Sequence, residues 1–91
     1  MSAASWQVAF DPAAAKELRK LGAPAREAIQ TYLRKRIATA EDPRRFGKAL
    51  AGDLAGLWRY RVGDHRIVAK IEDRRVLVLV LRVAHRREVY D

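Results

Sequence analysis

The C-terminal third of the chain, residues 57–90, has the hydrophobic and polar pattern of successive β-strands. Within the segment WRYRV (58–62), large apolar residues alternate with Arg59 and Arg61. Successive side chains of a strand point to opposite faces of a sheet. The pattern therefore predicts a strand that buries its apolar face and presents two arginines on the other.

Two further strands are predicted after short turns at residues 63–64 and 72–74. In the segment 65–72, Arg66 falls on the opposite face from the apolar residues of odd number. The segment 76–81 is apolar throughout, which is typical of a strand covered on both faces inside a sheet. Beyond it the chain becomes basic, and Arg82 and Arg86 share one face. Arginines of all three strands are thus expected over one side of a small sheet.

The N-terminal part predicts a strand followed by a helix. In residues 6–10, the large apolar side chains of Trp6, Val8 and Phe10 fall at alternate positions, as on one face of a strand. Asp11 followed by Pro12 is a typical helix start, because the Asp side chain can accept from the first free backbone N–H groups and proline suits the first turn. The helix is expected to end at Gly22.

A second helix is predicted from Pro24 to the Asp42-Pro43 pair, with apolar residues at helical spacing. These residues are Ala25, Ile29, Leu33 and Ile37. Because the turn between the two helices is short, they are expected to form an antiparallel hairpin that covers one face of the sheet. The fold class is α+β, a small and mostly antiparallel sheet in the order β-α-α-β-β-β.

The connector 44–56 contains three glycines and the apolar residues Phe46, Leu50 and Leu54. We expect a loop that is packed down by these apolar side chains. No internal repeat or change of composition divides the chain, and a chain of 91 residues suffices for one modest core. Residues 1–91 are therefore predicted to form a single domain.

The net charge of the chain restricts the possible classes of binding partner more than its length does. The chain has 19 Lys and Arg against 11 Asp and Glu, a net charge of +8. Such an excess of arginine favours a nucleic acid or an acidic protein as partner. There is no cysteine, and the longest apolar run is too short to span a bilayer. A cytoplasmic protein without a membrane role is expected.

Three segments carry a resemblance to a known family. They are WQVAFDPAAAKELRKL at the start, KALAGDLAGLWRYRVGDHRIV in the connector and first strands, and LRVAHRREVY at the end. In this order and in so short a basic chain, they resemble the RelE/ParE superfamily of bacterial toxins, and within it the RelE branch.

The resemblance implies the toxin of a type II toxin–antitoxin pair. Toxins of this branch bind in the ribosomal A site and cut messenger RNA there, without a metal or other cofactor. The RNA 2′-hydroxyl attacks the adjacent phosphate, leaving a cyclic phosphate and a 5′-hydroxyl. The implied partners are mRNA on the ribosome and a RelB-like antitoxin, in a complex expected to be a heterotetramer.

The resemblance also implies roles for five residues. Arg59 and Arg66 would hold the scissile phosphate and stabilise the charge that develops on it. Arg86 would lie near the leaving 5′-oxygen, and Tyr90 would stack on a splayed nucleotide. Arg61 stands where relatives have a lysine that takes a proton. Because arginine keeps its own proton, Arg61 is expected to stabilise charge.

His85 is the candidate for proton transfer in place of that lysine, because imidazole suits acid–base work near neutral pH. Other basic residues are expected to bind RNA around the catalytic group. They are Arg34, Arg44, Arg45, Lys48, Arg82 and Arg87.

Two alternative functions are consistent with a basic chain of this fold. One is a ParE-type toxin, which inhibits DNA gyrase by binding. The closing HRREVY segment argues against it, because that branch lacks the basic and tyrosine residues found there. The other is a non-catalytic RNA-binding protein or a decayed toxin, for which the missing lysine is the main argument.

Overall fold

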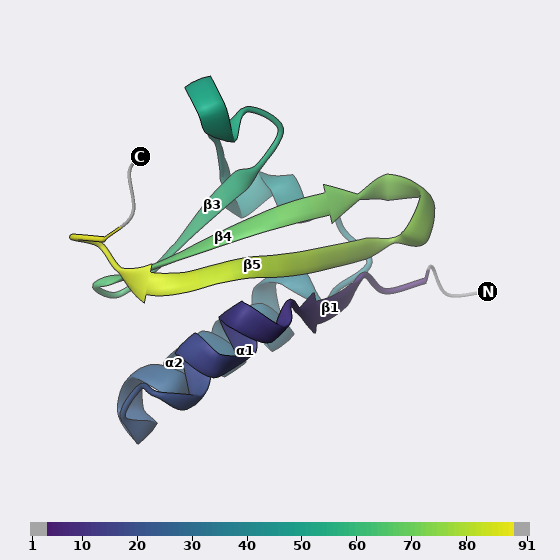
Figure 1. Cartoon of the computed structure of the whole chain (residues 1–91). Coiled ribbons are helices and arrows are strands. Elements are labelled where there is room, and N and C mark those ends of the chain that lie inside the picture. The colour runs from purple at the N-terminus through teal and green to yellow at the C-terminus, as the bar shows by residue number, and fades with distance from the viewer. Residues whose placement is uncertain (1–3, 89–91) are drawn as a thin grey trace.

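A computed structural model of the chain describes residues 4–88. These residues form a five-stranded sheet with two helices on one face (Figure 1), which confirms the predicted α+β class. The strands are β1 (Gln7–Phe10), β2 (Lys48–Ala49), β3 (Trp58–Val62), β4 (His65–Glu72) and β5 (Leu77–His85). The helices are α1 (Pro12–Arg19) and α2 (Ala23–Tyr32), and α2 continues into a π turn, Leu33–Ile37. Short 3-10 turns lie at Pro43–Phe46, Gly52–Leu54 and Asp73–Arg75.

The strands lie in the order β1-β5-β4-β3-β2. All neighbours are antiparallel except β1 and β5, which are parallel. Strand β5 thus lies inside the sheet, as its apolar sequence predicted. Its bounds differ from the predicted 76–81. Val76 has a left-handed backbone with φ of 49° and closes the preceding turn, and pairing continues to His85.

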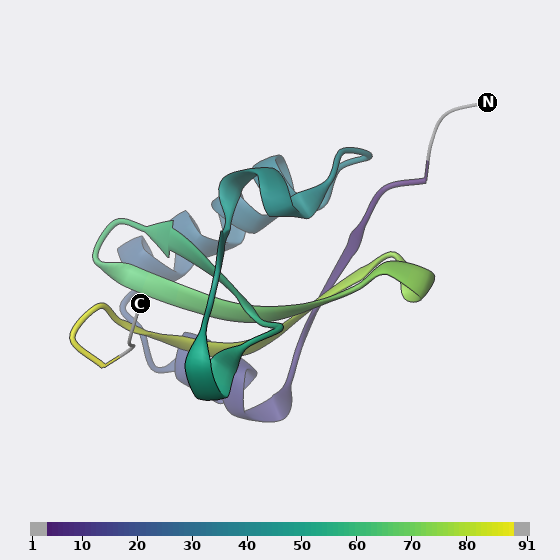
Figure 2. The ribbon, with the colours of Figure 1, turned by 90° about the horizontal axis from the view of Figure 1, so that it is seen from above.

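The helices pack against the sheet as an antiparallel hairpin, as predicted. In Figure 1 both lie below the sheet, whereas the Gly52–Leu54 turn stands above it. Helix α1 packs under β5 and α2 under β3, an arrangement that Figure 2 shows from above. The start of α1 is as expected, because the Asp11 carboxylate accepts a hydrogen bond of 3.0 Å from the Ala13 backbone N–H.

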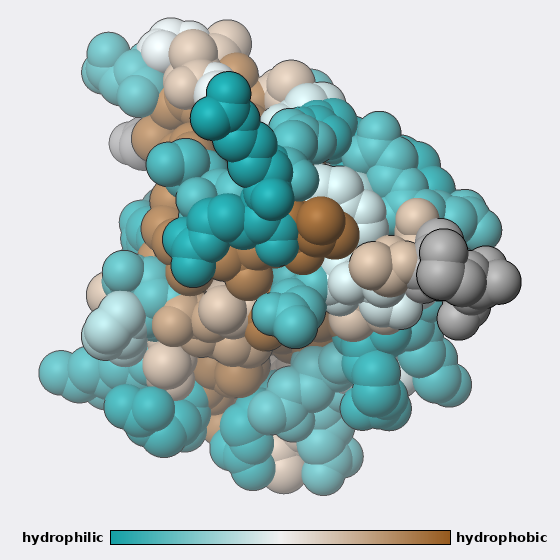
Figure 3. Space-filling model, turned by 90° about the vertical axis from the view of Figure 1, so that its right-hand side faces the viewer, coloured by the Kyte–Doolittle hydropathy of each residue, from teal (hydrophilic) through white to brown (hydrophobic). Residues whose placement is uncertain are grey.

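The core lies between the helices and the lower face of the sheet. Its fully buried large side chains include Ile29 and Ile37 from the helical layer and Tyr60, Ile67 and Val78 from the strands. Some apolar side chains still reach the surface, where Figure 3 shows them as a band between hydrophilic residues at the end of the molecule that carries the β4–β5 turn. The lower face of the sheet therefore packs against the helices and forms the core.

The second helix ends earlier than predicted. Regular α-helix stops at Tyr32, and the Ala38 N–H donates to the Leu33 carbonyl at 2.8 Å, which closes a π turn. An apolar stripe at every fourth residue drifts around an α-helix of about 3.6 residues per turn. The wider π turn offsets that drift and keeps Ile37 buried.

The connector is also more structured than predicted. Residues Lys48–Ala49 form a short strand on β3, and Leu50 is buried. The predicted packing of Phe46 and Leu54 is wrong, since they are 37% and 36% exposed. The backbone passes close to the core at Gly47, where a Cβ would lie 3.1 Å from the Tyr60 ring.

Candidate nucleic-acid interface

The sheet face opposite the helices, here called the open face, collects arginines from three strands. The register pairs Arg59 on β3 with Val68 on β4, and Val68 with Arg82 on β5. Lys48 on β2 is paired with Arg59. Paired residues of neighbouring strands project to the same side and lie about 5 Å apart. These four residues therefore form one row across the sheet, with Val68 between two arginines.

A second row follows along the strands. Arg61 is paired with Arg66, and Arg66 with Ala84. Arg86 lies just beyond the end of β5, where its backbone N–H donates to the Asp64 carbonyl at 2.8 Å. The structure thus brings Arg59, Arg61 and Arg66 together on one face with Arg86 at its end, as the alternating sequence predicted.

The exposure of these arginines differs from the expectation. Arg59 and Arg66 are only 6% and 5% exposed, whereas Arg61 is exposed and the Arg86 side chain is about half exposed. One Arg66 Nη1 contact is a hydrogen bond of 3.2 Å to the His65 carbonyl. Burial reduces screening by water, so a guanidinium held in this way acts more strongly on a nearby anion than an exposed one.

His85 is not brought into the arginine group. Its register partner is His65, and both follow the parity of the core residues Ile67 and Val83, so they belong to the face that the helices cover. The two imidazole rings meet edge to face with centroids 5.7 Å apart. The His85 Nδ1 atom accepts from the Arg87 N–H at 3.3 Å. His85 thus has the opposite parity to the arginines of the open face, and its role in proton transfer stays a prediction.

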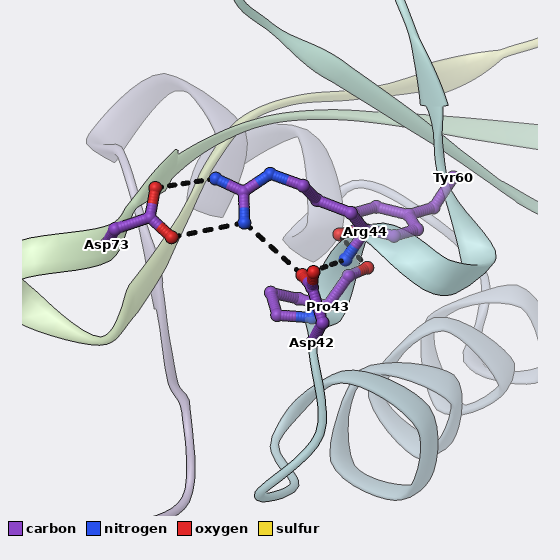
Figure 4. A network of polar contacts seen from close by, with 5 residues as sticks. All are labelled: Asp42, Pro43, Arg44, Tyr60 and Asp73. Carbon is purple, nitrogen blue, oxygen red and sulfur yellow. Dashed lines mark hydrogen bonds and ion pairs between the residues drawn. The ribbon is translucent and has the colours of Figure 1, made fainter.

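Arg44, predicted to bind RNA, has a structural contact at the far end of the sheet. Its guanidinium donates to both carboxylate oxygens of Asp73, at 2.6 and 3.1 Å, and to Asp42 at 3.3 Å (Figure 4). The hydrogen bonds that Arg44 donates to Asp73 raise the pKa of Arg44, and the same contact lowers the pKa of Asp73. Arg44 thereby ties the connector to the β4–β5 turn.

The neighbouring Tyr60 anchors the same connector from inside the core. Its hydroxyl donates to the Pro43 carbonyl at 2.7 Å (Figure 4). Burial, followed by the nearby Tyr32, raises the pKa of Tyr60 far above its usual value. The tyrosine is thus held neutral, as a hydrogen-bond donor.

Two more predicted RNA-binding residues also lie away from the open face. Arg45 forms an ion pair of 2.5 Å with Glu41, and its guanidinium lies 4.4 Å from the centre of the Phe46 ring. Arg34 lines a cavity of about 410 Å³ between β1 and the second helix. Of the six predicted residues, Lys48 and Arg82 lie on the open face, and the exposed Arg87 follows its end. Tyr90 lies outside the described residues.

Arg82 is positioned by a feature that the sequence did not reveal. The register between β4 and β5 shifts after Val68, so Leu81 is an extra residue, a β-bulge, in β5. Glu17 of α1 accepts from the Val83 backbone N–H at 2.9 Å and from Arg82 at 3.3 Å. Because Glu17 lies 65 residues before Arg82, no local pattern indicated this contact.

The described residues 4–88 hold no group of three His, Asp or Glu side chains that could bind a metal ion. Within the same residues, no helix is long and apolar enough to cross a membrane. The chemistry available on the open face is that of fixed positive charge. It suits an anion with several oxygens, such as the phosphates of a nucleic acid backbone.

Comparison with known proteins identifies the family. A family model described as "ParE toxin of type II toxin-antitoxin system, parDE" matches residues 8–90. The chain belongs to this toxin family. The resemblance to the RelE/ParE superfamily is thereby confirmed.

Curated relatives of this toxin include two from Mycobacterium tuberculosis. Toxin RelG is 32% identical over 85 residues, which cover 93% of this chain and 95% of the relative. Toxin RelE is also 32% identical over 85 residues, covering 93% and 86%. These names agree with the RelE branch that the sequence motifs indicated.

Solved structures agree with the same family. The toxin–antitoxin complex RelBE2 of M. tuberculosis contains a chain with a TM-score of 0.83 and 30% identity, covering 92% of this chain and 94% of that one. The isolated E. coli RelE toxin has a TM-score of 0.71 and 28% identity, covering 88% and 83%. The fold of this toxin is therefore that of RelE proteins.

Proposed function

We propose that this toxin is a ribosome-dependent endoribonuclease that cuts messenger RNA in the ribosomal A site. The observation that carries the proposal is the arginine group of the open face, with Arg59, Arg61 and Arg66 in adjacent register positions and Arg86 at its end. Relatives named RelE and RelG support the same function. A single-stranded message threaded over this face would meet fixed cations along its backbone.

In the proposed reaction, the 2′-oxygen of one nucleotide forms a bond to the adjacent phosphorus as the bond from phosphorus to the 5′-oxygen breaks. The 2′-hydroxyl proton is released to solvent, and the departing 5′-oxygen takes up a proton. The products are a 2′,3′-cyclic phosphate and a 5′-hydroxyl. Negative charge grows on the phosphate oxygens in the transition state, so preorganised cations lower the barrier.

The arginines divide this work by position and exposure. Arg59 and Arg66, which are buried, hold the non-bridging phosphate oxygens. Arg61 adds charge stabilisation, since its guanidinium does not give up a proton near neutral pH. Arg86 stabilises charge on the leaving 5′-oxygen. His85 is left out of the catalytic group because it follows the parity of the opposite face.

We also propose that a RelB-like antitoxin neutralises the toxin, in a complex of two toxins and two antitoxins. An antitoxin partner is supported by similar solved structures that are toxin–antitoxin complexes, including RelBE2 of M. tuberculosis. The toxin's charge of +8 supports an acidic partner, because opposite charge speeds association and favours the correct pairing.

A second function, inhibition of DNA gyrase by binding, has one specific observation in its favour. The family model that matches this chain takes its description from ParE toxins. Both functions would arrest growth, so growth alone does not separate them.

The test is induced expression in a bacterium, with primer extension on two copies of one message. One copy is translated, and the other differs only in a disabled ribosome-binding site. Cuts inside codons of the translated copy alone are expected. Growth arrest with both copies intact would contradict nuclease activity and favour gyrase as the target. Cuts in both copies would contradict dependence on the ribosome.

A further inference from the structure

The two-residue turn between β3 and β4 lies at the end of the open face where Arg66 and Arg86 meet. Val62 and His65 form the last register pair of this hairpin, with Gly63 and Asp64 between them. The φ of Gly63 is 59° and that of Asp64 is negative, which is the pattern of a type II′ hairpin turn. Such a turn matches the right-handed twist of its strands, so the groups bound to it are held in defined positions.

Arg66 is anchored on the backbone of this turn. Its Nη1 atom donates to the His65 carbonyl at 3.2 Å and to the Gly63 carbonyl at 3.5 Å. The residue is also almost completely buried. The guanidinium that holds the phosphate in the proposed function therefore has its place set by two carbonyls of one short turn.

Arg86 is tied to the same turn through Asp64. Its backbone N–H donates to the Asp64 carbonyl at 2.8 Å, one position beyond the His65–His85 pair that ends the β4–β5 ladder. Its Nη1 atom lies 3.8 Å from the Asp64 Oδ1 atom. Asp64 thus contacts Arg86 at two points, the backbone and the guanidinium.

The ion pair between Asp64 and Arg86 differs from the one that holds Arg44. A separation of 3.8 Å is too long for a hydrogen bond, so Asp64 does not occupy the donors of the Arg86 guanidinium. Asp73, in contrast, accepts two hydrogen bonds from Arg44, at 2.6 and 3.1 Å. Both side chains of the Asp64–Arg86 pair are more than half exposed, so the pair adds little to stability. Its attraction biases the direction of a long side chain and leaves the donors for a ligand.

We propose that Asp64 is a positioning residue, which directs Arg86 toward the leaving 5′-oxygen and sets its separation from Arg66. The inference rests on the proposed function, in which Arg66 holds the phosphate and Arg86 meets the oxygen that departs from it. Groups that act on neighbouring oxygens of one phosphate need a fixed spacing, and a misplacement of about 1 Å can cost about 100-fold in rate. Because residues 63–65 hold both arginines, one turn supplies that spacing.

The experiment is a double-mutant cycle with purified toxin on programmed ribosomes. Single-turnover cleavage of one message is measured over a range of toxin concentrations for wild type, Asp64→Asn, Arg86→Ala and the double variant. Asparagine suits this turn and keeps the backbone carbonyl, so Asp64→Asn removes only the charge of the carboxylate. Circular dichroism and urea denaturation of each variant check that the fold is retained.

Asp64→Asn is expected to lower the rate at saturating toxin by about tenfold, a part of the roughly 100-fold loss expected of Arg86→Ala. The toxin concentration that gives half the maximal rate should not rise, because loss of a carboxylate does not weaken attraction to phosphates. In the Arg86→Ala background, the same substitution should change the saturated rate by less than about twofold. A residue that acts through Arg86 has no further effect once Arg86 is absent.

Asp53→Asn is the matched control. It makes the same change of charge at an exposed aspartate in the Gly52–Leu54 turn, which stands on the open-face side of the sheet in Figure 1. Its rate at saturating toxin should equal that of the wild type. A general effect of net charge on RNA binding would appear in both aspartate variants.

Other outcomes distinguish the inference from the proposed function. If wild-type toxin cuts and Asp64→Asn cuts at the same rate, Asp64 does not position Arg86, and the nuclease stands. If Asp64→Asn lowers the rate equally with and without Arg86, Asp64 acts independently of that arginine, and the inference is also overturned. If wild-type toxin makes no cuts in translated messages, the proposed function fails and the inference with it.

Discussion

The toxin has one group of arginines around the connector and another on the open face. The two groups differ in how closely carboxylates of the protein approach them. Around the connector and the β4–β5 turn, Arg44 binds Asp73 at 2.6 Å and Arg45 binds Glu41 at 2.5 Å. On the open face, Arg86 lies 3.8 Å from Asp64, and Arg61 makes no ion pair with any residue between 4 and 88. Arg44 and Arg45 are thus held by close carboxylates, whereas Arg61 and Arg86 have no described carboxylate within 3.5 Å, although Arg82 on the same face is paired with Glu17 at 3.3 Å.

The comparison shows that the net charge of +8 is not spread evenly over the surface. An arginine held by two carboxylate oxygens has satisfied its planar fork, and it gains little from an external phosphate. Arg44 and Arg61 are the same residue type and lie close in sequence to other basic residues. Only their surroundings in the fold decide that Arg44 is held by two carboxylates whereas Arg61 stays exposed.

The largest expected effect is that of Arg86→Ala on the open face. Loss of one preorganised donor to the transition state should lower the cleavage rate on the ribosome about 100-fold or more, while the fold is retained. The measurement is the single-turnover rate with saturating toxin, together with circular dichroism. Arg45→Ala removes an arginine of the other group and should cut at nearly the wild-type rate. Equal rates for Arg86→Ala and wild type would refute the catalytic role of Arg86.

Tyr60→Phe tests the structural group by removing its buried hydrogen bond. The Pro43 carbonyl would lose its donor, so the free energy of unfolding should fall by about 1–3 kcal/mol. Urea denaturation followed by tryptophan fluorescence measures this. Cleavage by the folded variant should be close to normal, because Tyr60 lies under the opposite face of the sheet. An unchanged urea midpoint would show that this anchor contributes nothing.

Asp73→Asn is expected to have a smaller effect on stability, and one that depends on pH. The contact with Arg44 holds the pKa of Asp73 below its usual value in the folded state. A lowered folded pKa stabilises the protein above the unfolded pKa, and this contribution disappears as pH falls through the folded pKa. Wild type should therefore be more stable than the variant at pH 7, and the difference should begin to shrink below about pH 4 and vanish only below the lowered folded pKa of Asp73. A difference that does not shrink as the pH falls below about 4 would rule out this ion pair as its cause.

The smallest expected effect is that of His85→Asn on cleavage. The ring follows the parity of the helix-covered face, so its loss should leave the single-turnover rate within about threefold of wild type. A hundredfold loss, with the fold intact by circular dichroism, would return His85 to the catalytic group.

Local pattern was sufficient for β1, β3 and β4, for the existence of β5, for the start of the first helix and for the face on which the arginines gather, but it missed β2. Alternation of side chains is a property of each strand by itself, so Arg59, Arg61 and Arg66 were assigned to one face correctly. Their differing burial was not predictable, because it depends on segments that fold over the sheet. The same holds for Arg44, whose partner Asp73 is 29 residues away.

Two backbone irregularities also escaped the sequence analysis. They are the π turn after Tyr32 and the extra residue Leu81 in β5, and both depend on packing between distant elements. Neither position has a glycine or proline that could have indicated the irregularity. The bulge aligns both Leu81 and Arg82 with Val68. A regular strand would have placed only one of them there.

The central claim is that RNA binds the open face. Its most direct test is an NMR titration of ¹⁵N-labelled toxin with a short RNA that carries a single 2′-deoxy nucleotide at the cut site and is therefore not cleaved. We predict that signals of Arg59, Arg61, Arg66 and Val68 shift as RNA is added, while those of Arg44 and Arg45 stay in place. Shifts concentrated around Arg44 and Arg45, with the β3–β5 signals unchanged, would contradict the account.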